Sequence, residues 1–282
     1  MKTTWLVEKF LFEDYEDELV KTIRGLDSTC HIIDDTDINF DFDKKIKNRF
    51  TDKDCVIFYG SLQLGRKIYS RTNFIPGIFL TIENYECYKY YGFYGDKLLN
   101  SDYLMMGMND VKRNKEKIFN YFSTDDVFIR PSNGYKTFTG QCLNKEQFEY
   151  ELDMLCKSYG GVDMDQLVII AKKQNVHQES RFIIVDGKLI DGSIYMTDGV
   201  LNKEKIVDLK AMELAKSVIN CYEPDRAFTI DIAKLKDGSY KVLEIGSFCC
   251  ASLYNADFKK VVKAVNKLMI KEYNDYWNLL DK

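Results

Sequence analysis

Two stretches of sequence constrain the fold of this 282-residue chain most strongly. Each contains an Asp-Gly pair with alternating apolar residues on both sides. The first, "SRFIIVDGKLIDGSIY", covers residues 180–195, and the second, "FTIDIAKLKDGSYKVLEIG", covers residues 228–246. Asp-Gly between two alternating runs is a strong signal for a tight turn joining antiparallel strands. The sequence therefore predicts two β-hairpins in the C-terminal half.

Helical and strand-like segments surround these hairpins. Apolar residues with helical spacing predict helices over about 145–159, 203–221 and 255–277, the first capped by Asn144. Residues 125–143 predict a strand, a polar loop and a second strand, and residues 167–176 predict a buried strand. Alternation of hairpins and helices favours an α+β arrangement here.

The N-terminal part has a different pattern. Residues 3–10 and 55–60 have the composition of short strands, residues 16–26 that of a helix, and residues 74–80 that of a strand or loop. We predict an N-terminal α/β lobe over 1–110 and an α+β region over 111–282. The latter divides into a small lobe over about 120–170 and a large lobe over about 171–282. The Gly60-Ser61 turn lies where open α/β sheets bind ligands, although its sequence favours a plain strand–helix turn.

Composition narrows the function classes. The formal net charge of -4 argues against a protein that coats nucleic acid, although a local basic groove stays open. No run of about 18 apolar residues is present and the N-terminus lacks the shape of a signal peptide, so we expect a cytoplasmic protein without membrane contact. The eight cysteines form no C-x-x-C pair, and with two histidines they predict reduced thiols rather than a zinc site.

Two carboxylates lie within the second hairpin. If its turn holds two residues, Asp231 lies opposite Glu244 and both side chains share one face of the sheet. Opposed, partly buried carboxylates repel each other and lose hydration. A divalent cation such as Mg²⁺ would remove both penalties, whereas the alternative is two acids on a solvated face.

Basic residues provide further candidates. Arg130 and Lys136 flank a segment rich in Ser, Asn, Thr and Gly, which suits phosphate binding, although an ordinary solvated loop has the same composition. Arg181 shares a strand face with Glu179 and could stabilise a developing negative charge, or the two could form a surface ion pair. Of the adjacent Lys172 and Lys173, one could contact a nucleotide, unless both are solvated.

The order of these segments resembles the ATP-grasp superfamily. The motifs are the basic strand–Gly loop–strand, the apolar strand, "E-x-R-F-x-x-x-x-G-K" and finally "D-I…L-E-I". The likeness is closest to the amidoligase-like ATP-grasp domains of bacteria and phages, and it is strongest over residues 127–254. This resemblance implies a pre-ATP-grasp lobe followed by two α+β lobes that clasp ATP.

The resemblance also implies roles for individual residues. Phosphate contacts would come from Arg130 and Lys136, nucleotide contacts from Glu179, and adenine contacts from Lys172, Lys173 and the backbone near Ile170 and Ala171. Asp231 and Glu244 would hold Mg²⁺, and Arg181 with Arg130 would be catalytic.

The implied activity is a ligase that consumes ATP and joins a small-molecule or peptide carboxylate, through an acyl phosphate, to an amine. One departure is visible: the family's final Glu-x-Asn is replaced by Glu244-Ile245-Gly246, followed by Ser247. A second metal therefore needs another ligand, such as Ser247. A phosphotransferase and a catalytically weakened nucleotide-binding protein are the alternatives.

Overall fold

The computed structural model describes residues 1–9, 16–51, 53–158, 162–205 and 208–280. The chain forms two compact units. Unit 1 contains residues 1–81, 178–232 and 244–282, and unit 2 contains residues 82–177 and 233–243. Each unit thus draws on separate stretches of sequence, and each is described by itself below.

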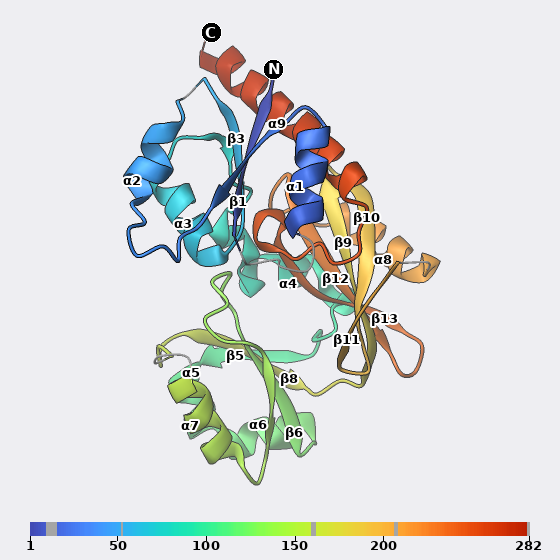
Figure 1. Cartoon of the computed structure of the whole chain (residues 1–282). Coiled ribbons are helices and arrows are strands. Elements are labelled where there is room, and N and C mark those ends of the chain that lie inside the picture. Colours follow the sequence, from blue (N-terminus) through green and yellow to red (C-terminus); the bar gives the residue numbers. More distant parts are fainter. Residues whose placement is uncertain (10–15, 52, 159–161, 206–207, 281–282) are drawn as a thin grey trace. The chain divides into compact units, whose positions relative to one another are not determined.

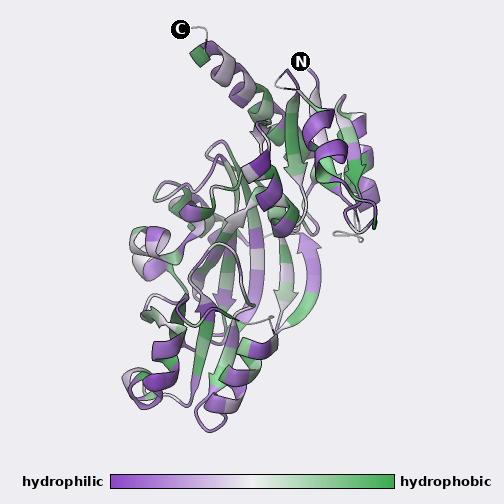
Figure 2. Ribbon diagram, turned by 90° about the vertical axis from the view of Figure 1, so that its left-hand side faces the viewer, coloured by the Kyte–Doolittle hydropathy of each residue, from purple (hydrophilic) through white to green (hydrophobic). Residues whose placement is uncertain are grey.

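The first sheet of unit 1 is parallel, with strand order β2-β1-β3-β4. Its strands are β1 (Thr3–Glu8), β2 (Thr29–Ile33), β3 (Cys55–Tyr59) and β4 (Ile75–Gly77). The helices of this region are α1 (Glu16–Gly25), α2 (Phe42–Lys45), η1 (Lys47–Arg49) and α3 (Leu62–Arg71). Every residue of β3 is buried, and in Figure 2 the strands next to the N-terminus are largely green, as expected for a parallel sheet covered on both faces.

Helix α9 (Phe258–Leu280) packs against this sheet, as Figure 1 shows. Its Asn266 is the main polar link. The Oδ1 atom of Asn266 accepts hydrogen bonds from Trp5 Nε1 at 2.8 Å and Thr3 Oγ1 at 3.1 Å, and its Nδ2 donates to Ser28 Oγ at 2.8 Å. These bonds satisfy buried polar groups of β1 and of the residue before β2, so α9 completes the N-terminal sheet.

In the Gly60-Ser61 turn between β3 and α3, the polar groups of Ser61 bond to other groups of the protein. The Ser61 side chain caps α3 by accepting from Leu64 N, and the Ser61 N–H donates to the Glu8 carboxylate at 2.5 Å. A carboxylate thus already occupies the place where an anionic ligand would bind. This geometry favours the plain strand–helix turn over a phosphate loop.

The second sheet has strand order β11-β10-β9-β12-β13. Its strands are β9 (Val176–Val185), β10 (Lys188–Thr197), β11 (Val200–Lys205), β12 (Ala227–Leu235) and β13 (Tyr240–Ser247). Helix α8 (Leu209–Ile219) lies between β11 and β12 in the sequence, and the short η4 (Phe248–Cys250) follows β13. All residues of β12 up to Ala233 are buried, as expected for an internal strand, which here lies between β9 and β13.

Unit 2 is built on an antiparallel sheet with strand order β5-β8-β6-β7. Its strands are β5 (Tyr103–Gly107), β6 (Asp126–Pro131), β7 (Gln141–Asn144) and β8 (Leu167–Lys172). Its helices are η2 (Ile82–Tyr85), α4 (Cys87–Tyr94), η3 (Gly95–Lys97), α5 (Met108–Arg113), α6 (Lys115–Phe122) and α7 (Phe148–Ser158). Buried side chains of α6, α7 and the sheet, including Phe119, Phe148 and Ile170, form its core.

Most of the predicted elements are confirmed, with shifted ends. The prediction of the first hairpin is confirmed, because Val185 pairs with Lys188 across the Asp186-Gly187 turn. The prediction of a helix over 203–221 is wrong at its start: residues 200–205 form β11, which pairs with β10, and the helix begins at Leu209. Phe10 and Tyr159, at the ends of predicted elements, lie outside the described residues.

The second hairpin differs from the predicted geometry. The Leu235 amide donates to the Ser239 carbonyl, and the Gly238 amide donates to the Leu235 carbonyl. Three residues therefore form the loop, not two, with Gly238 at a φ of 84°. The predicted pairing of Asp231 with Glu244 rested on a two-residue turn and loses that basis.

All eight cysteines are free, four of them buried and Cys142 exposed. Within the described part of the chain, none of the helices has the length and apolar character needed to span a lipid bilayer.

Candidate functional site

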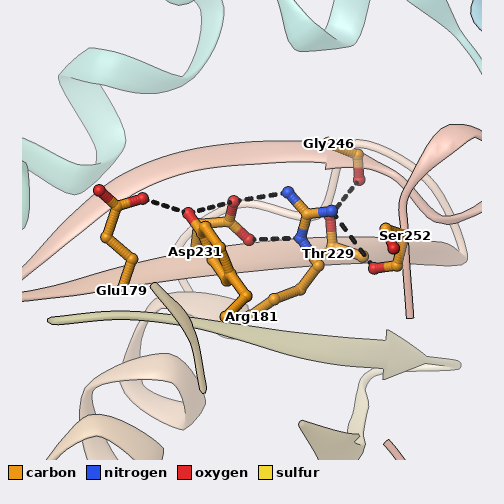
Figure 3. Close-up of polar contacts among 7 residues, drawn as sticks. Glu179, Arg181, Thr229, Asp231, Gly246 and Ser252 are labelled. Atoms are coloured by element: carbon orange, nitrogen blue, oxygen red, sulfur yellow. Dashed lines mark hydrogen bonds and ion pairs between the residues drawn. The ribbon is translucent and has the colours of Figure 1, made fainter. Parts of the chain in front are cut away.

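A buried ion pair forms the centre of the candidate site in unit 1. Arg181 on β9 donates from Nε to Asp231 Oδ1 at 2.8 Å and from Nη2 to Asp231 Oδ2 at 2.7 Å, as Figure 3 shows. The side chain of Asp231 is 2% exposed and that of Arg181 is 12% exposed. A two-pronged bond of this kind fixes the plane of the guanidinium as well as its position.

Tyr195 on β10 extends the pair into a network. Its hydroxyl donates to Glu179 Oε2 at 2.6 Å and lies 3.3 Å from Asp231 Oδ2. A β-bulge explains its orientation: Ile194 pairs with Ser180 and Met196 with Glu179, so Tyr195 is the extra residue between them. Bulges redirect a side chain in this way, and simple alternation along the strand could not have predicted it.

Two stacked aromatic rings lie beside the guanidinium. The rings of Tyr195 and Tyr254 stack with centroids 4.8 Å apart, and the guanidinium carbon of Arg181 lies 5.5 Å and 5.3 Å from these two centroids. Its Nη1 also donates to the Ser252 carbonyl at 3.3 Å. Tyr195, Tyr254 and Ser252 are not among the predicted site residues, because no motif in the sequence marks them.

The electrostatics of the network follow from burial. Burial raises the pKa of the Glu179 carboxyl, and the nearby carboxylates of Asp231 and Glu244 raise it further. The hydrogen bond from Tyr195 and the charge of Arg181 lower this pKa, but the net shift is upward. Burial also raises the pKa of the Tyr195 phenol, which keeps its proton available for donation. For Arg181, burial lowers the pKa, but the Asp231 carboxylate outweighs burial and the pKa is raised.

The carboxylates of the site divide into two kinds. Both oxygens of Asp231 accept from Arg181, so this ion pair competes with the predicted role of Asp231 as a metal ligand. Glu179 and Glu244 are half-buried and close enough for Glu244 to raise the pKa of Glu179. A divalent cation held by these two would relieve their repulsion, and Mg²⁺ commonly binds through one or two carboxylates plus phosphate oxygens.

The described residues contain no larger cluster of metal-binding side chains. No group of three or more His, Cys, Asp or Glu side chains there is arranged to hold a metal ion. Ser247 does not replace the missing Asn, because its hydroxyl is buried, donates to the Phe79 carbonyl at 2.5 Å and accepts from the Cys249 amide at 3.2 Å. The donor set therefore fits one cation better than two.

The remaining predicted residues lie in unit 2. Arg130 is on β6 opposite Ile169, and Lys136 lies in the segment between β6 and β7 with a φ of 49°. Lys172 and Lys173 are exposed at the end of β8, where Lys173 Nζ lies 3.8 Å from Asp126 Oδ2.

Ile170 and Ala171, whose backbone is predicted to contact adenine, lie within a strand that is paired on both sides. Strand β8 is central, with β5 on one side and β6 on the other. The Ser132 amide donates to the Leu167 carbonyl, and the Met108 amide donates to the Gln166 carbonyl. Because hydrogen-bonded residues alternate along each antiparallel pair, the backbone of Ile170 bonds to β5 and that of Ala171 bonds to β6. The backbone groups of both residues are therefore engaged in the sheet.

The segment after β6 carries unsatisfied groups. Ser132 Oγ and Asn133 Oδ1 are buried and have no hydrogen-bond partner within the described ranges. The segment is closely packed, since a Cβ at Gly134 would lie 2.8 Å from the Ile82 carbonyl oxygen. Buried polar atoms without partners are rare and commonly indicate a ligand or water.

Comparison with known proteins identifies the domain. A family model described as "ATP-grasp domain, R2K clade family 2" matches residues 109–264. No curated protein sequence matches the chain.

Solved structures share the fold. A crystal structure of D-cycloserine synthetase DcsG is 16% identical with a TM-score of 0.63, and the match covers 95% of this chain and 99% of that one. A D-alanine–D-alanine ligase from Bacillus anthracis is 12% identical with a TM-score of 0.62, covering 98% of this chain and 100% of that one. ATP-grasp ligase PsnB, solved with a minimal precursor, is 13% identical with a TM-score of 0.58, covering 96% and 100%.

At these identities the structures support the fold, and the family match covers more than half of the sequence. The chain belongs to the ATP-grasp superfamily, in family 2 of the R2K clade.

Proposed function

We propose that the protein is an ATP-dependent ligase that joins a carboxylate to an amine through an acyl phosphate, with release of ADP and phosphate. The buried Arg181–Asp231 pair, with Glu179 and Glu244 close by, is the observation that supports this proposal most strongly. A guanidinium fixed in a water-poor site is suited to stabilise negative charge that develops during acyl transfer. The carboxylates beside it suit a magnesium–phosphate group.

In unit 1 we assign the roles as follows. Arg181 binds the substrate carboxylate and the oxyanion formed when the amine attacks. Asp231 acts as a positioning residue, because its two oxygens accept hydrogen bonds from Nε and Nη2 of Arg181. Glu179 and Glu244 hold Mg²⁺, which neutralises phosphate charge when bound. Tyr195 keeps the Glu179 carboxylate oriented through its 2.6 Å hydrogen bond.

In unit 2 we assign nucleotide contacts. Arg130 and Lys136 bind phosphate oxygens, and the unsatisfied Ser132 and Asn133 add hydrogen-bonding groups on the same segment. Lys172, Lys173 and the residues that follow them contact the adenine, in place of the backbone of Ile170 and Ala171. No side-chain nucleophile is required, since the carboxylate oxygen attacks the γ-phosphorus of ATP and the amine nitrogen then displaces phosphate.

The first test is a thermal-shift titration with ATP, ADP and GTP, each with and without Mg²⁺. We expect stabilisation that requires Mg²⁺ and is larger for adenine nucleotides. A panel of amino acids and short peptides is then screened for ADP release that depends on both an acid and an amine. Phosphate retained on the acceptor would indicate a phosphotransferase, and stabilisation without turnover on any pair would contradict the ligase proposal.

Arg181→Lys is the sharper variant for the activity itself. It keeps a positive charge beside Asp231 but loses the two-pronged geometry. We expect it to lower kcat by at least about 100-fold with little change in ATP affinity, which is the loss typical of one oxyanion donor. Unchanged kcat would remove Arg181 from the chemistry.

A further inference from the structure

A second surface of unit 2 stands apart from the residues assigned to ATP. Strand β5 is at the edge of its sheet and pairs only with β8. Its sequence from Tyr103 to Gly107 is "YLMMG", without a charge, a proline or a bulge. Sheet edges of soluble proteins are normally protected by such devices, because unpaired strand groups recruit other strands.

The hydrogen-bond register fixes which backbone groups of β5 are open. The Met108 amide donates to the Gln166 carbonyl, so the alternation along the pair makes Leu104 and Met106 the residues bonded to Ile170 and Val168. The N–H and C=O groups of Tyr103 and Met105 therefore point away from β8. Within the described ranges no backbone partner is recorded for these four groups.

A pocket lies beside the same strand. It has a volume of about 400 Å³. Its lining comes from β5, α5 and α6 and the residue between these helices: Leu104, Met106, Asp110, Asn114, Lys117, Ile118 and Tyr121. Its apolar lining includes Leu104 and Met106, which alternate along β5 with the residues that have open backbone groups, and Ile118. One acid and one lysine among the lining residues leave the pocket without a strong preference for charge.

From this combination we infer that β5 and the adjoining pocket form a docking site for an extended peptide segment of a partner protein. The segment adds a strand to the open edge by bonding to Tyr103 and Met105, and it places a Leu, Phe or Tyr side chain in the pocket. Strand addition of this kind takes its affinity from main-chain bonds and its specificity from pockets for alternate side chains. The site is independent of the proposed ligase function.

A second copy of this chain fits the surface less well. Edge-to-edge pairing of two β5 strands would bring together two copies of Leu104 and Met106, and each of these already lines its own pocket. Both pockets would stay unfilled. A small apolar molecule could fill the pocket but would leave the strand groups unpaired. An extended peptide satisfies both features at once.

Hydrogen exchange of the free, full-length protein tests the edge first. Amides of Tyr103 and Met105 should exchange at least about 100-fold faster than those of Leu104 and Met106, which are bonded to β8. Equal protection of all four amides would mean that the edge is already covered, and this result would overturn the proposal.

Binding is tested with a library of acetylated, amidated octapeptides in which Thr alternates with Leu, Phe or Tyr. Addition of the library should protect the amides of Tyr103 and Met105 and leave those of Leu104 and Met106 unchanged. In the tightest peptide, N-methylation at every second residue should weaken binding about 10-fold, and methylation between them should have little effect. Binding without this alternation would indicate a pocket ligand rather than an added strand and would overturn the proposal, as would no binding.

Met105→Pro gives the matched variant. The Met105 N–H points away from β8, so proline removes an outward donor without breaking the β5–β8 ladder. The control Met105→Val keeps this N–H. We expect peptide affinity to fall about 10-fold or more in the first variant and to stay within about 2-fold in the second. Equal affinity of the two variants would contradict the docking site, and persistent protection of the Leu104 amide confirms that the proline variant is folded.

Discussion

Two polar clusters, one in each unit, differ in how far their hydrogen bonds are satisfied within the described residues. In unit 1 the buried side chains around Arg181 and Asp231 satisfy one another, through two-pronged, phenolic and carbonyl hydrogen bonds. In unit 2 the segment after β6 leaves Ser132 and Asn133 buried without partners within the described ranges. A satisfied network holds its shape before a ligand arrives, whereas unsatisfied groups lower the stability of the free protein and gain when a ligand binds.

In the proposed enzyme the two units would therefore have different roles. Unit 1 would supply preorganised charge for the chemistry, and unit 2 would supply groups that become satisfied only with the nucleotide. Substitutions in the first network should therefore change the stability of the free protein, and those in the second segment should change mainly the response to nucleotide.

The largest effect is expected for Arg181→Ala, which leaves the Asp231 carboxylate buried without its partner. Loss of one member of a buried pair typically costs about 3–5 kcal/mol in the free energy of unfolding. Urea denaturation measures this loss. The control is Arg226→Ala, which removes a half-exposed guanidinium paired with Asp186 and Glu272 and should cost about 1 kcal/mol or less. Similar losses for both variants would mean that the Arg181 network is not specially stabilising.

Tyr195→Phe should have a smaller effect, about 1–3 kcal/mol, because the phenyl ring keeps its stacking on Tyr254 but Glu179 loses its donor. The pKa of Glu179 should rise further, since the Tyr195 hydrogen bond lowers it in the native protein. Carboxyl ¹³C chemical shifts followed against pH measure this change. An unchanged Glu179 titration in the variant would show that the hydrogen bond is unimportant.

The pH dependence of Glu179 has a defined sign. Its pKa in the folded state is raised above the ordinary value of 4.5, so the folded state binds this proton more tightly than the unfolded state. The stabilising contribution is complete below pH 4.5 and is lost as the pH rises through the raised pKa. Glu179→Gln removes this term, so the variant should gain stability relative to the native protein between pH 4.5 and 8. A constant difference across this range would contradict the raised pKa.

Ser132→Ala should have the smallest effect on the free protein, a gain in stability of up to about 1 kcal/mol, since it removes a buried hydroxyl that has no recorded hydrogen-bond partner. The matched control is Ser193→Ala, whose equally buried hydroxyl donates to a backbone carbonyl and accepts from the Asn255 amide, and which should cost about 1 kcal/mol. Thermal stabilisation by Mg·ATP should be reduced in the first variant only. A reduction in both would remove Ser132 from the nucleotide assignment.

Local patterns predicted those features of the fold that depend on neighbouring residues. The Asp186-Gly187 turn and the shared face of Glu179 and Arg181 follow from hairpin chemistry and strand alternation. The structure confirms the turn, and it places Glu179 and Arg181 in one network, both linked to Asp231. The family resemblance, based on the order of motifs, predicted the ATP-grasp fold.

Features that depend on distant residues could not be predicted in this way. A bulge in β10, where it pairs with β9, directs Tyr195 into the site, and the sequence of β10 contains no signal that predicts this bulge. Residues 200–205 have the composition of a helix but form an edge strand, because pairing with β10 outweighs local propensity. The backbone of Ile170 and Ala171 is occupied because β8 is a central strand, a property of the whole sheet.

The bonds of Asn266 have a consequence for the order of events during protein synthesis. Strands β1 and β3 leave the ribosome early, yet the acceptor of the Trp5 indole N–H lies 261 residues further along the chain. Until α9 is made, one face of the N-terminal sheet lacks both its apolar cover and its polar partners. Contacts so distant in sequence close slowly. A nascent chain of this protein should therefore depend on chaperone protection until its last helix emerges.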